Sequence, residues 1–422
     1  MKVFITVVCS LVIIATLWAV SIPKMQDLGI PYAKPAEPDS ESIQVTWFGV
    51  TTLLIDDGTT QILIDGFFSR PSLMDLALER PIEPELETIR DVLDRFSINR
   101  LKTVIPVHSH FDHAMDSAEV AKQTGAVLMG SESTALIAKG SQLAAQQIIV
   151  VDEKVPYDLG QFKIEFVESK HAPLATNGPI SGTVTQPLTL PAPYTAWKLG
   201  KAYTLIFTHP KGRFLIQGSA GFIPGALDDL KVDTVFLGTG GLTGLTRDYQ
   251  NQYLDEFVHQ RRARTVFTLH HDDLFGDLGS VEQSLMYPEF DRTSAFDLMQ
   301  STNPRLVVDG FMASVTPFAE KISSKDDSFL LEDAKDMDFM KDCNIRAYWG
   351  DISENTKGAI WQYIQTLYML GTTINAIPED TLSMIETVAK QCADKLENSG
   401  EKIDESALMK SMQGMLGGML KK

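Results

Sequence analysis

The stretch His108-Ser109-His110-Phe111-Asp112-His113 places three imidazoles and one carboxylate within six residues. It follows the apolar run LKTVIPV at 101–107, which predicts a buried strand that leads into a polar loop. Imidazole nitrogen and carboxylate oxygen are both ligands that suit zinc. The chain has only eight histidines in 422 residues, so this density argues against an ordinary exposed turn. The loop therefore indicates a metal site, with two ligands available to each of two ions.

The segments around this loop predict an α/β fold with mixed sheets. Residues 43–66, IQVTWFGVTTLLIDDGTTQILIDG, are apolar and β-branched and are divided by Asp57-Gly58, which indicates a hairpin. Residues 265–273, TVFTLHHDD, repeat the pattern of an apolar strand that runs into histidine. Residues 83–96 and 249–262 have the spacing of amphipathic helices. Strands interspersed with helices in this way are typical of an α/β domain.

Together these features resemble the metallo-β-lactamase superfamily, over roughly residues 43–310. ILIDG at 62–66 resembles the family's early strand ending in aspartate, VESKH at 167–171 the strand that delivers its third histidine, and FTLHHDD at 267–273 the strand that delivers its last. The neighbouring WFG at 47–49 matches too. Within the superfamily the chain is most similar to the branch of ascorbate-phosphate lactonases and N-acyl-phosphatidylethanolamine phospholipases D. The resemblance implies a four-layer αβ/βα sandwich with the metals at one edge.

The resemblance also implies a ligand set for each metal. One metal would be held by His108, His110 and His171, and a second by Asp112, His113 and His270. Asp65 would support the metal loop, and Asp112 would also orient or deprotonate the attacking water. His270 is preferred to His271, because the family often has His-x-Asp-Asp after this strand and alternation points the next side chain the other way. The expected cofactor is zinc, as one or two ions, with iron or manganese as alternatives.

One position departs from the family pattern. The family usually places an aspartate between the two metals in a Gly-Asp-Thr-Gly-like turn, whereas the matching turn here is Gly218-Ser219-Ala220-Gly221. A neutral hydroxyl offsets the repulsion between two cations less well than a carboxylate does. Ser219 is therefore a candidate bridging residue, and we expect one metal to bind tightly and the second weakly or not at all. A shifted alignment of this turn is the alternative interpretation.

These features indicate a metal-dependent hydrolase that uses metal-activated water on an ester, a lactone or a phosphodiester, in a small molecule or a lipid. Two alternatives stay open. The first is an iron-dependent redox enzyme of the same fold, because the same ligands hold iron. The second is a non-catalytic, metal-stabilised binding or scaffold protein, because the bridging aspartate is replaced. The net charge of −18 argues against nucleic acid as a partner, and three cysteines cannot form a disulfide scaffold or a cysteine zinc cage.

The N-terminus has the pattern of a targeting segment. Residues 3–22 are uncharged and mostly apolar, and 20 such residues are long enough to cross a bilayer as a helix. With Lys2 before them, residues 1–22 indicate either a signal peptide cleaved after Ser21 or a membrane anchor. Residues 23–42 hold four prolines and are expected to be a linker. We therefore expect an exported, periplasmic protein, either soluble after cleavage or anchored to the inner membrane.

The C-terminal part changes character. Residues 43–317 are expected to form the hydrolase domain and residues 326–422 a helical extension. Three helices are predicted there, the first two capped by Ser353 and Asp380 and the last starting at Ser406. Their apolar stripes favour packing onto a core or a partner, and the oligomeric state stays open. Cys343 and Cys392 either pair in an oxidising compartment or remain thiols.

Three further features lie near the expected site or outside it. His209 and His259 are expected to be ordinary surface residues. Residues 172–195 hold five prolines and are interpreted as a lid or substrate wall, or as a stiff surface connection. The sequence Gly238-Thr239-Gly240-Gly241 favours a tight turn near the site over a nucleotide-binding loop.

Overall fold

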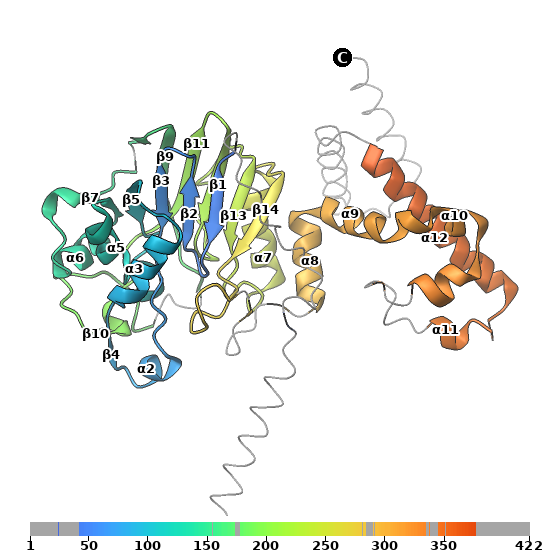
Figure 1. Ribbon diagram of the computed structural model, residues 1–422, viewed down its shortest axis with the longest axis horizontal. Coiled ribbons are helices and arrows are strands. Elements are labelled where there is room, and N and C mark those ends of the chain that lie inside the picture. The colour runs from blue at the N-terminus through green and yellow to red at the C-terminus, as the bar shows by residue number, and fades with distance from the viewer. Residues whose placement is uncertain are drawn as a thin grey trace, which may run out of the picture. The chain divides into compact units, whose positions relative to one another are not determined.

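The structure is a computed structural model (Figure 1). It describes Lys24 and residues 42–153, 155–173, 178–280, 282–283, 290, 292–334, 337, 345–350 and 352–376. The chain divides into two compact units, residues 1–303 and 304–422. The predicted end of the hydrolase domain, residue 317, falls within the second unit.

Fourteen strands are described in the first unit: β1 Gln44–Trp47, β2 Leu53–Asp56, β3 Gln61–Ile64, β4 Pro81–Ile82, β5 Leu101–Ile105, β6 Val127–Gly130, β7 Ile148–Val150, β8 Tyr157–Leu159, β9 Phe162–Ser169, β10 Ala192–Pro193, β11 Ala202–His209, β12 Gly212–Gln217, β13 Thr234–Gly238 and β14 Thr265–Leu269. One six-stranded sheet has the order β1–β2–β3–β5–β6–β7, antiparallel as far as β3 and parallel beyond it. The other has the order β14–β13–β12–β11–β9–β8, with β12, β13 and β14 parallel. A short antiparallel ladder joins β4 to β10.

Helices cover the outer face of each sheet, as Figure 1 shows for α3, α5 and α7. The helical segments of this unit are α2 Leu73–Ala77, α3 Leu86–Arg95, α4 Phe111–Ala114, α5 Ser117–Thr124, α6 Glu132–Gly140, η2 Ala145–Gln147, η4 Tyr194–Ala196, α7 Arg247–Leu254, the π-helical turn η5 Asp255–His259, and α8 Arg292–Thr302. The helices expected within 83–96 and 249–262 are thereby confirmed as α3 and as α7 followed by η5.

Strand alternation explains why the sheets bury both faces. Leu53 and Ile55 of β2 enter the core between the two sheets, whereas Leu54 packs on the other side with residues of α3 and α5. A third cluster fills the space between the second sheet and α7, η5 and α8. Both sheets are thus apolar on each face, as expected for sheets covered on both sides. The layers run helix, sheet, sheet, helix, so the predicted four-layer αβ/βα sandwich is confirmed. The hairpin at Asp57-Gly58 is the β2–β3 connection.

The prediction that His209 is a surface residue is wrong. Its side chain is fully buried, with Nε2 3.4 Å from Asp57 Oδ2 and the ring tilted against Phe162. The turn sequence around His209 indicated exposure, but the sandwich packs this hairpin against the β2–β3 turn, 152 residues away. His259 is half-buried and lies 2.7 Å from Asp255 and 2.8 Å from the Ser301 carbonyl, so it is not a free surface residue either.

The second unit is helical in its described residues: α9 Pro304–Val315, η6 Thr316–Phe318, α10 Ala319–Ser324, the π-helical turn η7 Phe329–Asp333, α11 Ile345–Tyr348 and α12 Glu354–Ala376. It has its own core, which includes Phe329, Trp349 and Trp361. The carboxylate of Asp327 accepts hydrogen bonds from the indole rings of Trp349 and Trp361. Ser353 caps α12 as expected, since its hydroxyl accepts from the Thr356 amide at 3.2 Å.

Several predictions lie outside the described residues. These are the apolar segment 3–22, the linker apart from Lys24 and Ser42, the helices expected from Asp380 and Ser406, and the cysteines Cys343 and Cys392. Among the residues that the structure does describe, no helix is long and apolar enough to cross a membrane.

Candidate metal centre

The histidine loop is set by the end of β5. The strand pairs with β3 on one side and β6 on the other, so its carboxyl end leaves the sheet at a fixed edge. Two residues separate the end of the strand from His108, and His110 stands at the N-terminus of the short helix α4, which carries Asp112 and His113. All four side chains are buried. A local sequence of six residues thus directs four potential ligands into the interior at one sheet edge.

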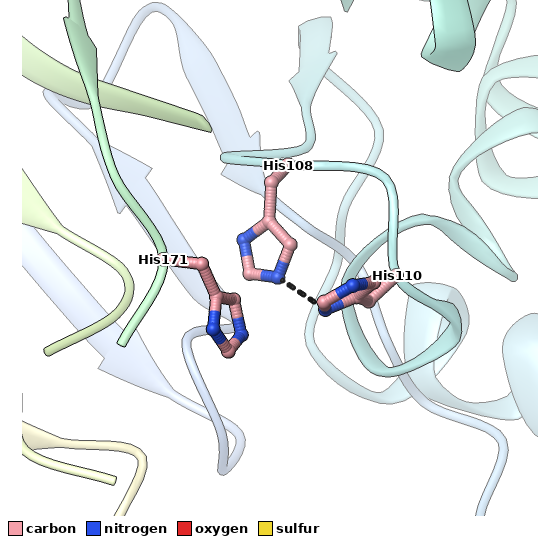
Figure 2. Close-up of side chains that lie close together, drawn as sticks. All are labelled: His108, His110 and His171. Carbon is pink, nitrogen blue, oxygen red and sulfur yellow. Dashed lines mark hydrogen bonds between the residues drawn. The ribbon is translucent and has the colours of Figure 1, made fainter. Parts of the chain in front are cut away.

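The first group consists of His108, His110 and His171, whose ligand atoms lie within 4.8 Å of one another. Figure 2 shows the three rings converging, with His108 Nε2 3.0 Å from His110 Nδ1. His110 Nε2 lies 3.3 Å from the Ile180 carbonyl, and His171 Nδ1 lies 2.9 Å from the Ala172 carbonyl. Since a carbonyl accepts, these two nitrogens carry the protons. Nδ1 of His110 and Nε2 of His171 are thereby left as the nitrogens that can bind a metal, and without an ion His110 Nδ1 faces His108 Nε2.

The second group consists of Asp112, His113 and His270, again within 4.8 Å of one another. Asp112 Oδ2 lies 3.4 Å from Nε2 of both histidines. His113 Nδ1 donates to Asp65 Oδ2 at 2.7 Å, and Asp65 Oδ1 accepts from the Val107 amide at 2.8 Å. Asp65 therefore lies where the resemblance implied, tying His113 to the start of the metal loop. A carboxylate behind an imidazole fixes its tautomer and raises its basicity toward a metal.

Electrostatics keep the first group neutral. Burial lowers the pKa of His110 to about 3 and of His171 to about 4, and it holds the pKa of His108 well below the usual value. All three are therefore unprotonated at neutral pH, the state in which imidazole binds a metal.

The second group has the opposite charge balance. Burial opposes protonation of His113, but the Asp65 and Asp112 carboxylates outweigh it and raise its pKa to about 10. Burial also opposes ionisation of Asp112, yet His113 and His270 keep its pKa well below the usual value. This part of the site favours a positive charge, which a proton on His113 supplies in the absence of an ion.

The donor set fits a divalent metal. His113 Nε2 is buried and makes no hydrogen bond to any described residue, although Asp112 lies beside it. Such an orphaned atom is rare in a protein interior and is explained by a missing ligand. Five imidazoles and one carboxylate in two groups are ligands that zinc accepts, and iron and manganese also accept them.

Ser219 lies next to the first group. Its hydroxyl is buried and accepts from the amide of Ala172, the residue after His171, at 3.0 Å. The turn at 218–221 thus lies beside a ligand, where the alignment put it, and it supplies a hydroxyl engaged with backbone in place of a carboxylate.

His270 and His271 take different environments. His270 belongs to the second group, whereas His271 is buried against Trp47 and Phe290, with ring centroids 5.2 and 5.7 Å away. The glycine turn at 238–241 touches the first of them, because a Cβ on Gly240 would lie 2.8 Å from His270 Nδ1. The expected tight turn near the site is confirmed, and glycine at 240 is required by this close approach.

The proline-rich loop forms a wall of the site in its described residues, 172–173 and 178–195. Ile180 presents its carbonyl both to His110 and to the amide of Leu199, the latter at 2.8 Å. Tyr194 packs edge-on against Phe111 of the histidine loop. Val184 and Trp197 are buried in an apolar cluster that also includes Phe111. The site is therefore bordered by apolar and aromatic side chains on this side.

Two buried acids near the site were missed by the sequence analysis. Asp116 accepts from the amides of Phe68 and Ser69, and Asp272 accepts from the amide of Val50. The signal for Asp272 was its place directly after the His-His pair, and for Asp116 its place three residues after His113.

Comparison with known proteins agrees with this geometry. Residues 45–189 match the family model of the Metallo-beta-lactamase superfamily. Over 93 residues the chain is 28% identical to a protein of Pyrobaculum islandicum named a UPF0173 metal-dependent hydrolase. The matched region covers 21% of this chain and 32% of that protein. The chain is 32% identical over 89 residues to one of the same name from Heliobacterium modesticaldum, covering 21% and 30%. The chain thus spans about a third of the length of these curated relatives.

Solved structures with some similarity include Igni18, a metallo hydrolase from Ignicoccus hospitalis. Its identity is 14% and its TM-score 0.40, with 62% of this chain and 93% of that chain covered. An isothiocyanate hydrolase from Delia radicum gut bacteria has 14% identity and a TM-score of 0.38, with 60% and 91% covered.

Proposed function

We propose that this chain, whose residues 45–189 match the metallo-β-lactamase superfamily, is a metal-dependent hydrolase with its site at the two ligand groups. The observation that carries the proposal is the pair of three-ligand groups at one edge of the sandwich, with lone pairs directed inward. The names of the curated relatives, which refer to metal-dependent hydrolases, support it.

The chain's own residues have distinct tasks in this reaction. When bound, a divalent metal supplies Lewis acidity and lowers the pKa of water. His108, His110 and His171 would hold one ion, and His113 and His270 with Asp112 the other. Asp112 is ionised at neutral pH, so its carboxylate can orient a water molecule or take its proton. The apolar wall at Phe111 and Tyr194 limits access of bulk water and strengthens the electrostatic interactions inside.

We infer zinc as the metal, because imidazole-rich sites with one carboxylate suit it, with iron or manganese as the alternatives. The second group has a carboxylate ligand and Asp65 behind it, whereas the first group is neutral. We therefore expect the Asp112 group to bind a cation more tightly. Because Ser219 brings no charge between the groups, filling both is expected to need a higher metal concentration.

The substrate class that we propose is an ester, a lactone or a phosphodiester, in a small molecule or a lipid. The apolar wall suits a substrate with an apolar part next to the scissile bond. We also propose that residues 1–22 direct the protein to the periplasm, as a cleaved signal or an inner-membrane anchor, because of their apolar sequence.

Metal analysis joined to an activity panel tests the proposal. The protein is purified without chelator, its metals are counted per chain, and hydrolysis is measured on esters, lactones and phosphodiesters. His108→Ala and His110→Ala should each lose metal and turnover, while His259→Ala, a matched histidine outside the site, should keep both. Ser219→Asp should raise the affinity for the more weakly bound of the two metals.

Three outcomes contradict the proposal. Full activity in His108→Ala would rule out this site, and a redox-active iron would favour the redox alternative. Bound metal without hydrolysis over the whole panel would favour the binding or scaffold alternative.

A further inference from the structure

We propose that Asp272 and Arg70, acting through the backbone of Val50, are positioning residues that hold His270 ready for its metal. The inference rests on the proposed function, since it concerns the second ligand group. Neither residue belongs to a ligand group, and each acts through the backbone of the turn between β1 and β2.

The centre of this arrangement is an unusual backbone conformation at Val50. Val50 is fully buried and has φ +49°, in the left-handed region that β-branched residues avoid. A residue is held in such a conformation only when its surroundings fix it, and this often happens at functional sites. The Val50 peptide must therefore be held by strong contacts on both sides.

Those contacts come from the turn that carries His270. The Val50 amide donates to both carboxylate oxygens of Asp272, at 2.8 and 3.0 Å. The Val50 carbonyl accepts from the His270 amide at 2.9 Å. One residue of the turn between β1 and β2 thus holds both ends of the segment 270–272, which follows β14. The indole of Trp47 also donates to the Val50 carbonyl, at 3.1 Å.

His270 itself needs this support. It has φ +61°, again in the left-handed region, directly after β14. This conformation turns the chain out of the strand and brings the imidazole to Asp112, 3.4 Å away. Without the hydrogen bonds to Val50, the segment would gain conformational freedom that it must lose again on metal binding.

Arg70 provides the countercharge for Asp272. Its Nη2 donates to the Phe48 carbonyl at 2.9 Å. A Cβ on Gly49, which has φ +101°, would lie 2.5 Å from Asp272 Oδ2 and 2.6 Å from Arg70 Nη2, so the two groups flank the same point. Burial lowers the pKa of Arg70, and Asp272 is the carboxylate that opposes this most strongly. Glycine at 49 therefore leaves room for the Arg70 guanidinium and the Asp272 carboxylate on either side of the turn.

The arrangement is selective for one of the two metal groups. His110 and His171 are oriented by the carbonyls of Ile180 and Ala172, and the described contacts of His108 are likewise outside this turn. Among the described contacts of the ligand histidines, the hydrogen bond to Val50 belongs to His270 alone. Loss of Asp272 should therefore weaken the second group and leave the first unchanged.

The test measures metal affinity at each group separately. His110→Ala disables the first group and His270→Ala the second, so each background isolates one site in the full chain. Zn²⁺ affinity is measured by competition with a chromophoric chelator. In the His110→Ala background, Asp272→Asn should weaken binding about 10- to 100-fold, as substitutions behind a ligand typically do. In the His270→Ala background it should change affinity less than about twofold.

The matched control is Asp273→Asn, an adjacent acid whose carboxylate accepts only from the Phe275 amide among the described residues. It should leave both affinities unchanged. Arg70→Lys gives a second test if Asp272→Asn does not fold, and should weaken the second group by about 3- to 10-fold. If folded Asp272→Asn binds Zn²⁺ at the second group as tightly as Asp273→Asn does, the role assigned to Asp272 is wrong. That result would leave the proposed function intact. Absence of any Zn²⁺ binding in the unsubstituted protein overturns the proposed function itself.

Discussion

Two buried histidine–aspartate pairs lie before and after β3, and only one of them has the features of a site. In the turn between β2 and β3, Asp57 lies 3.4 Å from His209, and directly after β3 Asp65 lies 2.7 Å from His113. All four side chains are fully buried. The residue types and the burial are the same, so neither explains the difference in role.

The difference lies in the second nitrogen of each imidazole. His209 Nδ1 accepts from the Lys211 amide at 3.1 Å, so both its nitrogens have partners within the fold. His113 Nε2 has no hydrogen-bond partner among the described residues and faces Asp112 and His270. A histidine–aspartate pair whose imidazole nitrogens both have partners stabilises the fold. A pair whose imidazole has one nitrogen without a partner, beside further ligands, could hold a metal ion. The number of ring nitrogens without a hydrogen-bond partner among the described residues therefore separates the two roles.

Replacement of His113 should have the largest effect on turnover. His113→Ala loses a ligand of the second group, and we expect turnover to fall about a thousandfold or more, together with loss of metal. His209→Ala should keep turnover within about twofold per folded molecule. Steady-state rates and metal content of the two variants check this, and equal losses would remove the distinction between the pairs.

Loss of the carboxylate behind each imidazole gives the next largest difference. Asp65→Asn takes away the acceptor that fixes His113, and metal affinity should fall about 10- to 100-fold. Asp57→Asn should leave metal affinity unchanged. Zn²⁺ competition titrations of both variants test this, and an unaltered affinity in Asp65→Asn would contradict the role of Asp65.

Stability should respond in the opposite order. His209→Ala removes the ring nitrogens that contact the Lys211 amide and Asp57 Oδ2, and it opens space beside Phe162. We expect the free energy of unfolding to fall by about 2–4 kcal/mol. Denaturant unfolding, followed by a spectroscopic signal from the first unit, measures this change in free energy. A midpoint like that of the unsubstituted protein would mean that the pair contributes nothing to the fold.

The smallest expected effect is a pH dependence of stability that comes from the Asp57–His209 pair. Burial raises the pKa of Asp57, but hydrogen bonds from Thr59, Thr60 and His209 outweigh it and hold the value below 3.8. A carboxyl whose pKa is lowered on folding stabilises the protein above its unfolded pKa, and this is lost as pH falls through the folded value. The stability difference between the unsubstituted protein and Asp57→Asn should therefore narrow between about pH 5 and pH 3. Unfolding curves across this range test the sign, and a widening difference contradicts it.

Local patterns account for what could be predicted from the sequence. The strand before His108, the hairpin at Asp57-Gly58 and the helix capped by Ser353 depend on neighbouring residues, and the structure has them. The six ligand positions were named because the motifs at 108–113, 167–171 and 267–273 resemble those of a known family. The structure brings those six residues into two groups of three.

Contacts between distant segments explain what was missed. Asp57 and His209 are 152 residues apart, and Val50 and Asp272 are 222 apart. Nothing near His209 in the sequence indicates that a second hairpin covers it. The left-handed conformation of Val50 opposes its intrinsic preference, so no local rule predicts it. The place of Arg70 beside Phe48 and Asp272 likewise depends on contacts between segments that are distant in the sequence.

The carbonyls behind His110 and His171 have a consequence for how this site tolerates sequence change. Every residue type carries the same backbone oxygen, so residues 172 and 180 can be replaced without removing the acceptor, provided that the chain keeps its path. The proline-rich wall can therefore vary its side chains, and with them the molecules that it admits, while the first ligand group keeps its orientation. Asp65 has no such freedom, because its acceptor is a side chain. Libraries that randomise the wall should therefore yield many folded, metal-binding variants, whereas libraries at Asp65 should yield few.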